Sequence, residues 1–200
     1  MKKIAVFLFE GAELFEIASF TDIFGWNNIV GLKEFRDIKV ETISYKESIK
    51  CTWGGKIKVE KVITEENIGK FFDYDILVIP GGFGKANFFE GKNNEIFKKL
   101  IKYFSESNKI IVAICSAVIN LLESGYIKNK KVTTYLLDNK RYFNQLKNYN
   151  IIPIEEEIME DDNLLTCSGP GNALELSFRV LEKLTSKENV EIVKKNMFLK

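Results

Sequence analysis

A cysteine stands where one structural pattern changes into another, in the stretch KIIVAICSAVINLLESG, residues 109–125. The apolar run 110–114 predicts a buried strand, and the small residues after the cysteine permit a tight turn into a helix over 116–124. Unpaired backbone N–H groups at the start of a helix stabilise a thiolate, so this position predicts a lowered pKa for the Cys115 thiol. The alternative is an inert cysteine that is buried as a small apolar side chain.

A second apolar run ends in a glycine-rich turn, in the stretch ILVIPGGFG, residues 76–84. Glycine frees the backbone to present its N–H groups toward a neighbouring strand end. If this strand lies beside the strand that ends at Cys115, the backbone N–H groups of Gly82 and Ser116 would form an oxyanion hole. The alternative is a plain loop between a strand and a helix.

Alternating strands and helices must bring these two turns together. Apolar runs predict strands over 3–9, 38–43, 76–79 and 110–114, and helical periodicity predicts helices over 13–29, 93–105 and 116–124. Further along we expect a strand over 131–135, a helix over 140–146, a hairpin that turns at 161–163, and helices over 173–184 and from 187. Runs that are apolar throughout suit a parallel sheet covered on both faces. The sequence therefore predicts an α/β layered fold, in one domain that spans 1–200.

The most restrictive feature of the composition is that the chain has no histidine. Cys–His and Ser–His mechanisms need an imidazole to take the proton of the nucleophile, so they are excluded within one chain. The three cysteines, Cys51, Cys115 and Cys167, show no CxxC spacing, and we expect neither a metal nor another cofactor. An odd number of cysteines without an export signal favours reduced thiols in the cytoplasm.

Charge and hydropathy narrow the class of partner. Lys and Arg number 29 against 28 Asp and Glu, a net charge of +1. No basic stripe indicates nucleic acid, and no basic amphipathic helix indicates a membrane surface. The apolar run that follows the first residues is too short for a signal peptide, and no run is long enough to cross a bilayer. We expect a small-molecule substrate, with no nucleic acid and no membrane as partner.

A glutamate near the N-terminus could complete a site with Cys115. Glu16 is followed by Phe20 and Ile23 at helical spacing, which places it on an apolar stripe. A carboxyl buried there would have a raised pKa, and its protonated form could donate a hydrogen bond to a thiolate or a proton to a substrate. Glu13 has comparable spacings, so periodicity alone does not choose between the two glutamates.

Four stretches occur in the order of a known family: FLFEGAELFE, DYDILVIPGGFG, IIVAICSAVINLLESGYIKNKKVTTY and NLLTCSGPGNALELSFRVLEKL. Over nearly its whole length the chain resembles the ThiJ/PfpI superfamily of class I glutamine amidotransferase-like proteins. The resemblance implies a flavodoxin-like three-layer α/β/α sandwich with a mostly parallel sheet and a small β-hairpin, Cys115 on a nucleophile elbow, and a homodimer. It also implies that Glu16, rather than Glu13, contacts the cysteine sulfur. The substrate pocket is expected around Gly81, Phe83, Tyr135 and the loops near Trp53.

The chain departs from this family at three positions. Ser116 stands where the proteolytic branch has a histidine, Tyr135 where another branch has a histidine, and Ser168 where some relatives have an arginine. A phenol is a poor general base at neutral pH. A protease or amidase activity is therefore physically weak, whereas chemistry that uses a cysteine and a glutamate survives every departure.

Three functions remain in competition. Similar family members act on reactive carbonyls such as glyoxals or hydrate isonitriles, which predicts an enzyme in which Cys115 attacks a small electrophile and Glu16 moves the proton. The second is a redox sensor or stress protein in which Cys115 is oxidised to a sulfinic acid that a carboxyl stabilises. The third is a ligand-binding module without turnover.

Overall fold

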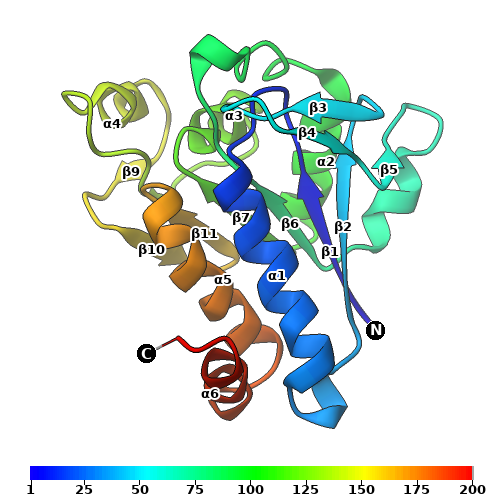
Figure 1. The fold of residues 1–200 in the computed structure, drawn as a ribbon. Helices are drawn as coiled ribbons and strands as arrows, with labels where there is room; N and C mark the ends of the chain where they lie inside the picture. The colour runs from blue at the N-terminus through cyan, green and yellow to red at the C-terminus, as the bar shows by residue number, and fades with distance from the viewer. Residues whose placement is uncertain (200) are drawn as a thin grey trace.

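The centre of the molecule is a sheet of seven strands in the computed structural model, which describes residues 1–199 (Figure 1). Its strands, in spatial order, are β10 (Ile158–Asp161), β11 (Leu164–Cys167), β7 (Ile110–Ile114), β6 (Ile76–Ile79), β1 (Lys2–Phe7), β2 (Ile38–Ser44) and β5 (Lys61–Val62). Only the pair of β10 and β11 is antiparallel within this sheet of the described residues.

Helices cover both faces of the sheet (Figure 1). The helices α1 (Leu14–Val30), α5 (Pro170–Leu184) and α6 (Lys187–Asn196) lie on one face, and α2 (Glu95–Glu106) and α3 (Ala117–Glu123) lie on the other. In β1, Ile4 and Val6 face the first set of helices, whereas Ala5 and Phe7 face the second. Because both faces are buried, the strands are apolar throughout. The expected flavodoxin-like three-layer sandwich is confirmed.

The smaller elements agree less well with the sequence patterns. The hairpin that turns at 161–163 is confirmed as β10 and β11, but the strand predicted over 131–135 shortens to β8 (Lys131–Val132), which pairs with β9 (Ile152–Pro153) in a separate sheet. The helix predicted over 140–146 is α4 (Arg141–Gln145). Helix α5 begins at Pro170, not at 173, because proline at the first helical position loses no hydrogen bond.

Short elements without an apolar signature were missed from the sequence. Two of them, β3 (Ser48–Lys50) and β4 (Lys56–Lys58), form an antiparallel hairpin that carries Trp53 at its turn. The short strands β5 and β9 were also missed. So were four stretches of 3₁₀ helix: η1 (Lys33–Phe35), η2 (Ile68–Asp73), η3 (Gly84–Ala86) and η4 (Leu146–Asn148). None of the helices within residues 1–199 is long and apolar enough to cross a membrane.

The register of β6 and β7 brings the two predicted turns together. Ile79 pairs with Ala113, so the glycine turn that follows β6 lies beside Cys115, which follows β7. Both turns leave the carboxyl ends of parallel strands, where open α/β sheets bind their ligands. The loop after β1 reaches the same edge, because the backbone N–H of Glu13 donates to the carbonyl of Gly81 at 2.7 Å.

Candidate active site

Cys115 stands on a strained turn between β7 and α3. Its φ of 56° lies in the left-handed region, which costs a non-glycine residue about 1–2 kcal/mol. Two hydrogen bonds hold the turn: the N–H of Cys115 donates to the carbonyl of Cys167 at 2.8 Å, and the Thr134 hydroxyl donates to the carbonyl of Cys115 at 2.6 Å. A strained turn from a strand into a helix is the backbone form expected of the predicted elbow, and strain that the surroundings enforce is typical of functional sites.

Glu16, in the first turn of α1, is fully buried next to this elbow. Its Oε2 accepts a hydrogen bond from the N–H of Gly81 at 2.5 Å, and its Oε1 has no hydrogen-bond partner among residues 1–199. A Cβ built on Gly81 would lie 3.1 Å from Oε2 and 2.9 Å from the Cβ of Cys115. The carboxyl and the cysteine therefore border the same small space.

Of the two pKa shifts predicted for this pair, the direction is right for Glu16 and wrong for Cys115. Burial raises the pKa of Glu16 to about 8, and the charge of Glu13 adds to this although the Gly81 N–H opposes it. Burial also raises the pKa of the Cys115 thiol well above its usual value, and the charge of Glu16 raises it further, whereas the hydrogen bonds from Ser116 act in the opposite direction. The predicted lowering of the pKa of Cys115 is therefore wrong, because desolvation outweighs the start of the short helix α3.

The structure separates the roles of the two glutamates that periodicity left open. Glu13 is the N-cap of α1, where its carboxylate accepts a hydrogen bond from the N–H of Phe15. It also lines the cavity in front of Cys115. Glu16 is the glutamate that is buried against Gly81 and whose charge acts on Cys115.

One of the two N–H groups predicted to form an oxyanion hole, that of Gly82, is already bound by the side chain of Ser116. The N–H of Gly82 donates to the Ser116 hydroxyl at 3.0 Å, and that hydroxyl donates back to the Gly82 carbonyl at 2.6 Å. The backbone N–H of Ser116 acts on the sulfur of Cys115. A substrate oxygen must therefore displace the Ser116 hydroxyl before it can use the N–H of Gly82.

A cavity of about 400 Å³ opens in front of Cys115. The residues that line it are Glu13, Phe15, Glu16, Trp53, Gly82, Phe83, Cys115, Tyr135, Pro170 and Gly171. Of the residues predicted for the pocket, Phe83 and Tyr135 are on this surface, but Gly81 is not, because it lies behind the Glu16 carboxyl that it binds. Phe15, Pro170 and Gly171 were missed; the Gly-Pro-Gly turn after β11 was the available signal, since it too follows a strand end at this edge.

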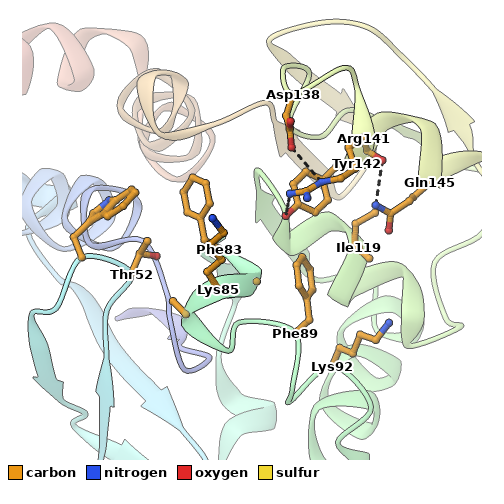
Figure 2. A pocket seen from close by; sticks show the side chains of 13 residues that line it. Thr52, Phe83, Lys85, Phe89, Lys92, Ile119, Asp138, Arg141, Tyr142 and Gln145 are labelled. Carbon is orange, nitrogen blue, oxygen red and sulfur yellow. Dashed lines mark hydrogen bonds and ion pairs between the residues drawn. The ribbon is translucent and has the colours of Figure 1, made fainter.

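A wider cavity of about 1020 Å³ adjoins the first and shares Trp53 and Phe83 with it. Figure 2 shows Phe83 and Lys85 between Thr52 on one side and Arg141 with Tyr142 on the other. Neither Cys115 nor Glu16 lines this space. Two of the three basic side chains that line this cavity already form ion pairs. Arg141 pairs with Asp138 at 3.2 Å, and Lys92 pairs with Glu123 at 2.9 Å. We therefore place the candidate chemistry in the smaller cavity.

No group of three or more His, Cys, Asp or Glu side chains within residues 1–199 could hold a metal ion. The donors at the elbow are one thiol and two carboxyls, of which Glu16 already accepts a backbone hydrogen bond.

Fold and site together define an α/β sandwich with a cysteine on an elbow and a buried acid beside it. The chain belongs to the DJ-1/PfpI family, whose model matches residues 2–183. It is 27% identical over 198 residues to Protein dj-1beta of Drosophila melanogaster, a match that covers 99% of this chain and 97% of that protein. The crystal structure of Drosophila melanogaster DJ-1beta superposes with a TM-score of 0.82 over 100% of this chain and 98% of that chain, at 26% identity.

A second relative carries a more specific name. The chain is 28% identical over 156 residues to the glutathione-independent glyoxalase DJR-1.2 of Caenorhabditis elegans, and the match covers 78% of each protein.

Proposed function

We propose that this protein is an enzyme that uses Cys115 and Glu16 to convert small reactive carbonyls of the glyoxal type into 2-hydroxy acids, without glutathione or another cofactor. The observation that carries the proposal is the free Oε1 of a fully buried glutamate beside a cysteine on a strained elbow, at the end of a small cavity. The name of the nematode relative supports the same substrate class.

The reaction balances with these two side chains and water. The Cys115 sulfur bonds to the aldehyde carbon, and the thiol proton passes to the carbonyl oxygen to give a hemithioacetal. The Glu16 carboxylate then takes the hydrogen of that carbon as a proton and returns it to the neighbouring carbon, while the hydroxyl proton of the hemithioacetal moves to the neighbouring carbonyl oxygen. The first carbon is thereby oxidised to a thioester and the second is reduced to an alcohol. Water hydrolyses the thioester, which releases the 2-hydroxy acid and restores the thiol. The oxidation of one carbon and the reduction of its neighbour cancel, so the reaction needs no external oxidant or reductant.

The electrostatics suit this cycle. A pKa of about 8 makes Glu16 a stronger base than an ordinary carboxylate, and general bases work best when their pKa lies near the working pH. Because burial raises the pKa of both groups, the pair carries at most one negative charge near neutral pH. The reactive form is the one that has lost a single proton, which lies on the thiol or on the carboxyl.

Turnover of methylglyoxal tests the proposal, measured as loss of the dicarbonyl and formation of lactate. We expect kcat/KM to rise about tenfold per pH unit toward a midpoint near 8. Cys115→Ala should abolish turnover, and Glu16→Gln should lower kcat roughly 10²–10⁴-fold and remove the midpoint. Cys51→Ala, which changes a buried cysteine in the loop between β3 and β4, is the matched control and should keep wild-type kinetics. Wild-type turnover by Cys115→Ala would refute the mechanism.

We extend the proposal to substrate binding, oligomeric state and location in the cell. The N–H groups of Gly82 and Ser116 hold the developing oxyanion after the Ser116 hydroxyl rotates away, while Phe83 and Tyr135 pack against the substrate. Two copies of the chain form a homodimer, and the protein works in the cytoplasm, where its three free cysteines remain reduced.

A further inference from the structure

A second cysteine lies beside the proposed nucleophile, and the proposed reaction does not use it. Cys167 ends β11, the strand that pairs with β7 on the side away from β6. The backbone N–H of Cys115 donates to the carbonyl of Cys167 at 2.8 Å. Cys167 is completely buried, whereas Cys115 is slightly exposed and lines the smaller cavity. A reagent in the cavity therefore meets Cys115 first.

The backbone positions suit a disulfide. In the parallel register Cys167 pairs with Ile114, so Cys115 is offset from it by one residue. With strands about 4.8 Å apart and a rise of about 3.3 Å per residue, the two cysteine Cα atoms lie roughly 6 Å apart. Disulfides usually join Cα atoms that are about 4.4–6.8 Å apart. No movement of either strand is required to bring the backbones within reach.

The side chains lie on the same face of the sheet. A residue that continued the strand after Ile114 would point away from Ile114 and Cys167, but the positive φ of Cys115 breaks that alternation. Cys115 instead packs in the same apolar cluster as Cys167. The Cys167 thiol donates to the carbonyl of Gly169 at 3.7 Å, and the charge of Glu16 acts on both thiols.

We propose that Cys167 is the resolving thiol for oxidised Cys115, so that peroxide converts the two cysteines into a reversible disulfide. The Cys115 sulfur takes one oxygen from the peroxide as the O–O bond breaks, which gives a sulfenic acid and water. The Cys167 sulfur then displaces that hydroxyl, the S–S bond forms and a second water leaves. The peroxide is reduced by two electrons and the two thiols are oxidised by two. The disulfide blocks the nucleophile and prevents the further oxidation to sulfinic acid.

The proton of Cys167 needs an acceptor during the second step. Burial raises the pKa of the Cys167 thiol to about 12, so this thiol remains protonated until the sulfenic acid forms. Glu16 is the buried carboxyl whose charge acts on it, and it can accept the proton as the S–S bond forms.

The test treats the full-length protein with an excess of hydrogen peroxide, which supplies the two oxygens that a sulfinic acid requires, alkylates the remaining thiols after unfolding, and identifies the products by mass spectrometry. We expect a single chain that has lost two hydrogens, a cross-linked pair of peptides that contain Cys115 and Cys167, and return to two alkylated thiols after treatment with dithiothreitol. In Cys167→Ser and Cys167→Ala, Cys115 should carry two added oxygens, and this product should form at least about tenfold faster than in the wild type. Cys51→Ala should behave like the wild type.

Each other outcome overturns the proposal. Sulfinic acid on Cys115 at the same rate in wild type and in both Cys167 variants would show that Cys167 resolves nothing. A bond from Cys115 to Cys51, a bond between two chains, or a Cys115 that does not react with peroxide would also exclude it. Methylglyoxal turnover is measured separately in reduced protein, so a failure here leaves the proposed enzyme activity intact, and a failure there leaves the disulfide intact.

Discussion

At the scale of single residues, the property that sets this site apart is a pair of acids that cannot both be charged. The sequence correctly predicted that burial on an apolar stripe raises the pKa of Glu16. It gave the wrong direction for Cys115, because the backbone pattern shows a helix start but does not show how completely the surrounding core removes water from the sulfur. We therefore expect the reactivity of Cys115 to depend on which of the two groups has lost its proton.

The raised pKa of Glu16 predicts how stability changes with pH. Since the carboxyl has a pKa of about 8 when folded and an ordinary value of 4.5, the folded state binds the extra proton between these pH values. The stability that this proton provides is fully present below pH 4.5 and is lost as the pH rises through about 8. We expect the unfolding free energy of the wild type to fall by roughly 1 kcal/mol per pH unit relative to that of Glu16→Gln across this window. Above pH 8 the difference between the two proteins should stay constant. Urea unfolding at pH 5.5, 7 and 9 measures the difference.

The control for this experiment is Glu191→Gln, which changes an exposed glutamate on α6. Its unfolding free energy should follow that of the wild type at all three pH values. If the curves of Glu16→Gln and wild type also ran parallel, folding would not raise the pKa of Glu16, and the expected midpoint of kcat/KM near pH 8 would be contradicted.

At the scale of elements, the sequence predicted the long strands, whose apolar runs are clear, and missed the short elements, whose patterns are brief. Apolar runs located the four parallel strands at the centre of the sheet, and the order of these strands then placed Cys115 beside the glycine turn. The hairpin of β3 and β4 was missed because its alternation is brief and mostly polar, and with it the position of Trp53 over the cavity. Which glutamate faces the sulfur depended on the rotation of α1, which spacing cannot fix when the helix is apolar on several sides.

The close approach of β6, β7 and α1 predicts a strict requirement for glycine at 81. A Cβ there would lie 2.6 Å from the carbonyl oxygen of Ile114 and 2.9 Å from the Cβ of Cys115, which is too close to relieve by side-chain movement alone. We expect Gly81→Ala to lower the unfolding free energy by about 1–3 kcal/mol and to lower kcat as the elbow moves away from Glu16. Gly69→Ala, where no atom lies within 4 Å of the added Cβ, serves as the control, measured by urea unfolding and methylglyoxal turnover. Equal effects of the two substitutions would contradict the proposed packing of the elbow.

At the scale of the whole molecule, one sheet connects the early and late parts of the described chain. Only β7 and β6 lie between β11 and β1 in this sheet, and α5 and α6 pack against α1. We therefore continue to propose a single domain over 1–200. The outer side of α1 exposes three large apolar side chains to solvent: Phe15, Trp26 and Ile29. Phe15 also lines the smaller cavity, so a partner on this face would lie close to the proposed active site.

The exposed side of α1 predicts where the proposed homodimer forms. Burying these side chains against a second copy removes apolar surface from water at about 25 cal/mol per Å², so charges placed there should separate the copies. We expect the wild type to have twice the mass of one chain by light scattering after size exclusion, and Trp26→Glu combined with Ile29→Lys to shift the protein to the monomer. Leu137→Glu, which places a charge on an exposed apolar residue near α4, should leave the mass unchanged. A wild-type monomer at micromolar concentration, or a dimer that Leu137→Glu disrupts and the α1 variant does not, would exclude α1 as the interface.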